Sequence, residues 1–181
     1  MSIKGSGKRD RKSPPPPDRP IIRSGSPIKK VRSKTTHAVR HFASEDAVAR
    51  VGEGLLARTL PRPEWTHEAH LAATTYLLLK HPEIDLDTAL PGLIRAYNES
   101  VGGVNDDSEG YHDTITRAYL HGVRLFLAEA DRAAPVHDLV NDLLHSPMGQ
   151  RDWPLRFWSK ARLMSVEARR GYVAPDLAVL P

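Results

Sequence analysis

The chain has 181 residues, enough for one domain of ordinary size and an additional segment. It contains no cysteine, which excludes disulfides and thiolate metal sites. It has no run of about 18 apolar residues and no apolar stretch typical of a secretory signal near its start. We therefore expect a cytoplasmic protein with no membrane partner.

Charge is distributed unevenly along the chain. Residues 1–40 contain twelve Lys or Arg against two Asp, a balance of +10, whereas the whole chain carries only +4. This composition, with the proline run 14–17, predicts a disordered, basic, Pro/Ser/Lys-rich tail over residues 1–36. Two interpretations of the tail remain open: a dispensable solvated extension, or a segment that binds nucleic acid or another polyanion.

Residues 37–181 are expected to form one helical domain, beginning with two helices. Ser44 is a candidate N-cap for the first helix, whose apolar side chains recur with helical spacing. Thr66 is the candidate cap of the second, which Pro82 stops. The predicted inward residues of the two helices are Ala47, Val48, Val51, Leu55 and Leu56, then Leu71, Thr74, Leu77 and Leu78.

Three more helices follow with the same apolar period. The third spans about residues 86–101 and ends at two glycines, the fourth about 111–131, and the fifth about 136–144. Because no strand-like alternation competes with them, we predict an all-α fold, a single bundle of five or six helices.

The last thirty residues have a different pattern. Trp153, Phe157 and Trp158 lie within six positions, and an extended end follows a short helical stretch at 165–170. Such aromatic density indicates either an extended C-terminal strap packed over an apolar groove or a lid over a small-molecule pocket.

Three of the nine histidines lie at helix-forming positions. His67 and His70 are three residues apart, which places both rings on the inward side of the second helix. His112 is expected on the inward face of the fourth helix, with Thr116 and Tyr119, while Asp113 is expected on its solvent side.

Burial near a helix N-terminus keeps imidazole neutral, and neutral imidazole is the form that binds divalent metals. His67, His70 and His112 are therefore candidate ligands of one divalent ion, with Zn, Fe, Mn and Ni all open. Two alternatives also stay open: a metal-free polar pocket built from the same residues, and purely structural histidines.

Further candidates surround these histidines. Glu68, Asp113 and Thr116 are candidate catalytic groups, although both carboxylates also suit a helix first turn. The candidate substrate-binding residues are Tyr111, Thr116, Tyr119 and Trp158.

Together these residues favour a His-lined pocket that holds or acts on a small molecule, with a metal polarising a bound oxygen. The alternative is a non-catalytic sensor or interaction module whose basic tail binds an anionic partner.

Three segments resemble a family of small uncharacterised bacterial helical proteins. They are residues 65–71 (Trp-Thr-His-Glu-Ala-His-Leu), 110–116 (Gly-Tyr-His-Asp-Thr-Ile-Thr) and the closing stretch 156–177 with its Pro-Asp-Leu ending. The resemblance covers about residues 60–180 and brings no assigned activity. It implies that His67, His70, His112, Thr114 and Thr116 belong to one constellation. The pair 118–119 (Ala-Tyr) departs from the bulkier aromatic pair expected there.

Removal of residues 1–36 should leave the cooperative unfolding of the domain nearly unchanged, because a disordered segment buries little surface. Urea unfolding of the full and shortened chains measures this. A loss of more than about 2 kcal/mol in the free energy of unfolding would show that the segment packs on the domain.

Overall fold

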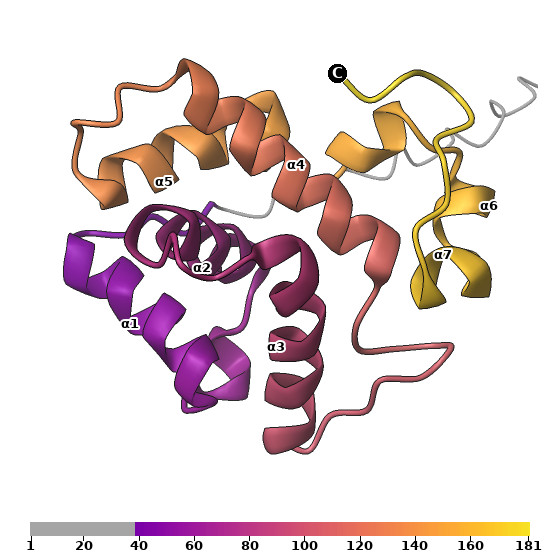
Figure 1. The fold of residues 1–181 in the computed structure, drawn as a ribbon, viewed down its shortest axis with the longest axis horizontal. Coiled ribbons are helices and arrows are strands. Elements are labelled where there is room, and N and C mark those ends of the chain that lie inside the picture. The colour runs from indigo at the N-terminus through magenta and orange to yellow at the C-terminus, as the bar shows by residue number, and fades with distance from the viewer. Residues whose placement is uncertain (1–38) are drawn as a thin grey trace, which may run out of the picture. The chain divides into compact units, whose positions relative to one another are not determined.

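The computed structural model of the protein describes residues 39–181, so the predicted tail lies outside the described residues. Described residues form seven α-helices and no strand (Figure 1), which confirms the all-α prediction. The helices are α1 (Glu45–Ala57), α2 (His67–Lys80), α3 (Leu86–Ser100), α4 (Asp113–Glu129), α5 (Val136–His145), α6 (Lys160–Leu163) and α7 (Val166–Arg170). In this part of the chain, no helix combines the length and the apolar character that crossing a bilayer requires.

Short polar side chains begin the first helices where the sequence predicts. The Ser44 hydroxyl accepts a hydrogen bond from the amide of Ala47 at the start of α1, and the Thr66 hydroxyl accepts one from Ala69 at the start of α2. Both bonds satisfy amides that have no partner within their own helix, as N-caps do. The two predicted caps are confirmed.

α2 is the most enclosed of the long helices. It contacts α1, α4 and α5, and Figure 1 shows it nearly end-on among them. Its buried side chains are Glu68, Ala69, Leu71, Ala72, Ala73, Thr74, Thr75 and Leu77. They lie on more than the single predicted face, and a helix that is apolar on most sides is a helix surrounded by others.

Close approach between α1 and α2 depends on a glycine. A Cβ at Gly52 of α1 would lie only 2.2 Å from the ring of Tyr76 on α2. The other long helices complete the main core through buried leucines, and Tyr97 of α3 is fully buried and donates a hydrogen bond to the carbonyl of Leu60.

The C-terminal segment forms a second apolar cluster against α4. It comprises Ala118, Trp153, Trp158, Leu163, Ala168 and Val173. Trp158 donates from its indole nitrogen to the carbonyl of Val173 at 2.9 Å. Thr114 of α4 joins the same stretch, because its hydroxyl donates to the carbonyl of Gly171 and accepts from the amide of Val173. The segment contains two short helices, α6 and α7, which is why there are seven helices and not five or six.

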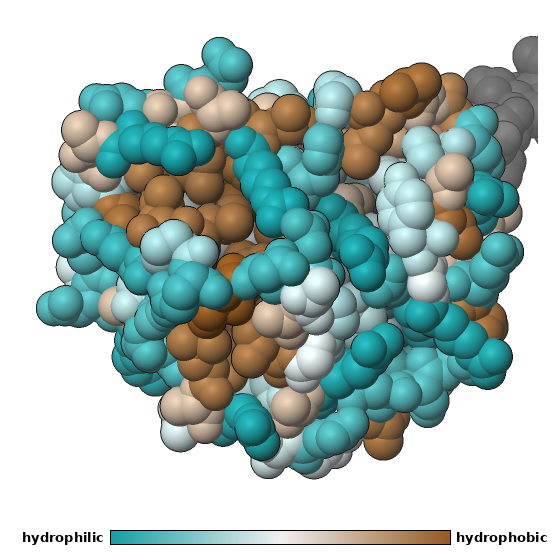
Figure 2. Space-filling model, in the orientation of Figure 1, coloured by the Kyte–Doolittle hydropathy of each residue, from teal (hydrophilic) through white to brown (hydrophobic). Residues whose placement is uncertain are grey.

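Most exposed large apolar side chains lie in this C-terminal part. They are Leu155, Met164, Val166, Tyr172, Leu177 and Val179, with Val39 and Val104 elsewhere. Figure 2 shows a mainly hydrophilic face with apolar surface between α2 and α5 and near the C-terminus.

Trp158→Ala should lower the free energy of unfolding by about 3–5 kcal/mol, because the ring is fully buried and its loss leaves a cavity. Urea unfolding measures the change. Tyr172→Ala is the matched control: that ring packs edge-on against Trp158 but is 50% exposed, so its removal should cost much less. Equal losses would show that Trp158 does not anchor the segment.

Candidate functional site

A small cavity lies where the first four long helices meet. Its volume is about 40 Å³. It is lined by Leu55, Trp65, His70, Leu71, Thr74, Leu90, Ile94, Thr116 and Tyr119. The structure thus brings three predicted site residues, His70, Thr116 and Tyr119, to one cavity whose remaining walls are mainly apolar.

His70 is held by a backbone hydrogen bond that fixes its tautomer. Its Nδ1 lies 2.7 Å from the carbonyl oxygen of Thr66, so Nδ1 carries the proton and donates. Nε2 is then left with a lone pair and no hydrogen-bond partner among residues 39–181. Of those residues' unpartnered side-chain polar atoms, only the Thr75 hydroxyl and the His137 Nδ1 are fully enclosed. Nε2 of His70 is unpartnered but is not one of these two enclosed atoms, so it is accessible to a ligand.

The ring of Trp65 packs against the ring of His70. The two ring centroids are 3.9 Å apart. Trp65 directly precedes the Thr66 N-cap and His70 is the fourth residue after it, so the pair occupies the positions of a hydrophobic staple. Tyr97 packs behind Trp65 with centroids 4.9 Å apart.

The environment of His70 keeps it uncharged at neutral pH. Burial lowers the pKa of His70 to about 4, against the opposing effect of its bond to the Thr66 carbonyl, and His67 and Arg151 lower it further. A base with so low a pKa takes up protons poorly at pH 7, so this arrangement suits a hydrogen-bond acceptor better than a general base.

His67 and Glu68 are satisfied by a segment far along the chain. The Nε2 atom of His67 donates to the carbonyl of Gly149 at 2.8 Å, and burial lowers the pKa of His67. Glu68 is buried and accepts from Arg151 at 2.9 Å. Burial alone would raise the pKa of Glu68, but hydrogen bonds from its own backbone and Thr66, with the charge of Arg151, lower it overall.

Tyr119 connects this first turn of α2 to the cavity. Its hydroxyl donates to the carbonyl of Gln150, and its ring packs edge-on against His67 with centroids 5.2 Å apart. Residues 149–151 therefore supply partners to three site side chains. No pattern in the sequence indicates that residues 149–151 contact these side chains. The position of Trp65 directly before the Thr66 cap, in contrast, could have identified Trp65 as a partner of His70.

His112 lies elsewhere, because α4 begins two residues later than predicted. His112 is the N-cap of α4, and its Nδ1 accepts from the amide of Ile115 while its Nε2 donates to the carbonyl of Leu163. Both ring nitrogens are thus engaged. His112 is buried, as predicted, but it precedes the helix and does not share the face of Thr116 and Tyr119, because its ring turns to the C-terminal segment.

Asp113 is also placed differently from the prediction. It was expected toward solvent, but it is buried and both oxygens are occupied, one by the Tyr111 hydroxyl at 2.8 Å and the other by Arg117 at 2.7 Å. Of the other predicted substrate-binding residues, Trp158 belongs to the C-terminal cluster and Tyr111 lies in a second, polar cleft.

The three predicted ligands do not fit a shared metal ion. Within residues 39–181, no group of three or more His, Cys, Asp or Glu side chains could hold one. His67 and His70 each retain one lone pair after their backbone bonds, but His112 retains none. Two imidazoles alone hold a divalent ion poorly.

Comparison of the chain with protein-family models, with curated proteins and with solved structures gives no match.

The low pKa of His70 predicts a pH-dependent stability. Between pH 6.5 and about 4 the unfolded chain binds a proton at this residue and the folded chain does not, so the free energy of unfolding falls as the pH falls. The contribution lost is up to about 3 kcal/mol. Urea unfolding at pH 7 and pH 4 should therefore show a smaller difference for His70→Leu than for the parent protein.

Thr74→Val is the matched control for this experiment. It removes a neighbouring hydroxyl that donates to the His70 carbonyl but introduces no change in titration. The free energy of unfolding of Thr74→Val should differ from that of the parent protein by the same amount at both pH values. An unchanged pH dependence in His70→Leu would contradict the assigned burial of the neutral ring.

Proposed function

We propose that this domain binds a small, mainly apolar compound carrying one O–H or N–H donor, and that Nε2 of His70 accepts from that donor. The observation that carries the proposal is the fixed tautomer of a residue that lines the cavity: the Thr66 carbonyl occupies Nδ1 of His70 and leaves Nε2 as an available acceptor. Ligand sites in proteins commonly combine apolar walls with a few fixed polar groups.

The cavity limits the size of the group that it receives. A volume of about 40 Å³ accommodates a few water molecules or a group of a few heavy atoms. The apolar walls come from side chains of four helices, so a larger ring requires these side chains to move. The hydroxyl of Tyr119 already donates its proton to the carbonyl of Gln150, so it offers a ligand no donor.

Binding is a better description than base catalysis for these residues. The pKa of His70 at about 4 makes it a weak base, and Glu68 is engaged by Arg151. The predicted polyanion-binding role of residues 1–36 concerns a different part of the chain, outside the described residues, and does not depend on this cavity.

Pyrrole and furan provide a matched pair of probes, because the rings have nearly the same size and only pyrrole carries an N–H donor. We expect pyrrole to bind at least about fivefold more tightly than furan, since furan leaves the acceptor without a partner. NMR titration of the Thr116 methyl and Tyr119 ring signals, which line the cavity and remain in every variant, measures both affinities.

His70→Leu should abolish the preference for pyrrole, while His145→Asn, an exposed histidine that does not line the cavity, should retain it. Equal affinity for the two probes, or a preference that survives in His70→Leu, would refute the proposed acceptor. Absence of binding by both probes would refute the cavity as a ligand site for compounds of this class.

A further inference from the structure

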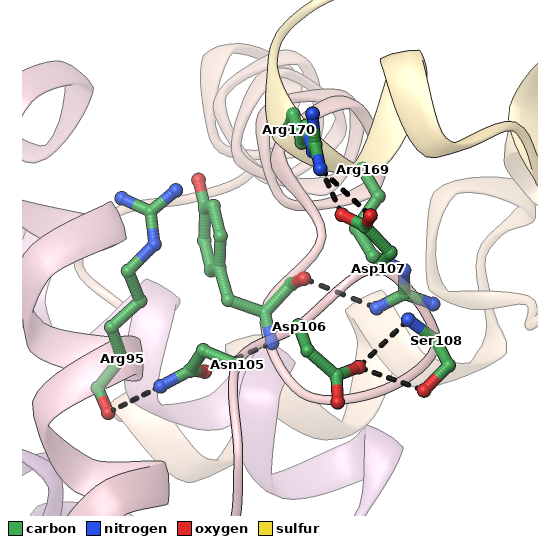
Figure 3. A pocket seen from close by; sticks show the side chains of 8 residues that line it. Arg95, Asn105, Asp106, Asp107, Ser108, Arg169 and Arg170 are labelled. Atoms are coloured by element: carbon green, nitrogen blue, oxygen red, sulfur yellow. Dashed lines mark hydrogen bonds and ion pairs between the residues drawn. The ribbon is translucent and has the colours of Figure 1, made fainter.

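A second and larger cavity lies on another side of α3. This polar cleft has a volume of about 610 Å³. It lies between α3, the loop 105–111 and α7, and none of its lining residues borders the His70 cavity. Figure 3 shows Arg95 on one side of the cleft and Arg169 and Arg170 on the other, with Asn105 and Asp106 between them.

The loop that forms the cleft wall is fixed by its own hydrogen bonds. The Asn105 side chain accepts from the Tyr111 amide and donates to the Arg95 carbonyl, which ties the loop to α3. Gly110 has a positive φ of 80°, and a Cβ there would lie 1.9 Å from the carbonyl oxygen of Val104. The wall is therefore preorganised for a ligand, which lowers the entropic cost of binding.

The two carboxylates of the cleft are already engaged. Asp107 accepts from Arg170 through both oxygens, at 2.7 Å each. Asp106 accepts from the amide and hydroxyl of Ser108 and from the amide of Glu109 through a single oxygen, Oδ1. Of the oxygens of these two carboxylates, only Oδ2 of Asp106 has no hydrogen bond to another residue among those that the structure describes.

Two guanidinium groups of the cleft lack a carboxylate partner among residues 39–181. Arg95 lies over the ring of Tyr111, 4.2 Å from its centroid, and its guanidinium makes no hydrogen bond within those residues. Arg169 donates only through one terminal nitrogen, to the carbonyls of Gly110 and Tyr111. The available polar groups are thus mostly N–H donors that carry positive charge.

We propose that this cleft binds a small molecule through an oxyanion, a phosphate or carboxylate group, that accepts hydrogen bonds from Arg95 and Arg169. Planar guanidinium groups match the geometry of such oxyanions, and charge-assisted bonds of this kind are stronger than neutral ones. The Oδ2 atom of Asp106 adds an acceptor for a hydroxyl group of the same ligand. The volume suits a compound the size of a small metabolite.

Titration of the full chain with inorganic phosphate and, separately, with sodium acetate tests this inference by NMR. The readouts are the backbone amides of residues 105–111 and the Nε–H signals of Arg95 and Arg169. These residue-specific signals separate the cleft from anion binding by the basic residues 1–36. A constant salt concentration of about 0.15 M keeps weak surface attraction screened.

We expect saturable shifts at the cleft with at least one of the two anions, and the anion that saturates identifies the class, phosphate or carboxylate. Arg95→Gln and Arg169→Gln should each weaken this binding at least tenfold. Arg124→Gln is the matched control, because Arg124 pairs with Asp87 outside the cleft, and it should bind as the parent does.

Arg95→Gln keeps the test decisive if Arg169→Gln disturbs the fold, because the loop bonds to the backbone of Arg95 and not to its guanidinium. Shifts confined to residues 1–36, or unchanged affinity in Arg95→Gln, would overturn the inference. So would the absence of saturable shifts at the cleft with both anions.

Discussion

The enclosure of α2 is the constraint on which the other features depend. Its small residues, such as Ala69, Ala72 and Ala73, are buried, and Gly52 of α1 leaves room for Tyr76. Helices that pack this closely leave little freedom in the placement of α1, α4 and α5 around α2. The cavity forms where the side chains of α1, α2, α3 and α4 do not fill the space completely.

Enclosure of α2 also explains why its first turn is chemically unusual. His67, Glu68 and His70 lie in this turn, and polar groups removed from water must find hydrogen-bond partners. His67 and Glu68 find theirs in residues 149–151, whereas His70 bonds within its own turn to Thr66. The same burial that keeps His70 neutral leaves its second nitrogen unpartnered within the described residues, and this is the origin of the proposed ligand contact.

The start of α4 separates the two groups of residues that the sequence suggested as one constellation. With His112 as the N-cap, its ring serves the helix amide of Ile115 and the C-terminal segment, and Thr114 bonds to that same segment. Thr116 lies one turn further and reaches the cavity with His70. His112 and Thr114 thus anchor the C-terminal cluster, while His70 and Thr116 share the cavity.

The sequence by itself determined the all-α class, the Ser44 and Thr66 caps and the approximate ranges of the five long helices. These follow from helical periodicity and from side chains that satisfy nearby amides, which are interactions within one stretch of chain. It also placed His70, Thr116 and Tyr119 on inward faces, and they meet at one cavity. Only the tertiary structure decided which partners each polar group has. The turn of His112 toward Leu163 and the pairing of Glu68 with Arg151 join residues that periodicity treats separately. The reason is physical: a hydrogen bond to a distant carbonyl or guanidinium depends on how helices pack, and a spacing pattern in the sequence carries no information about that packing.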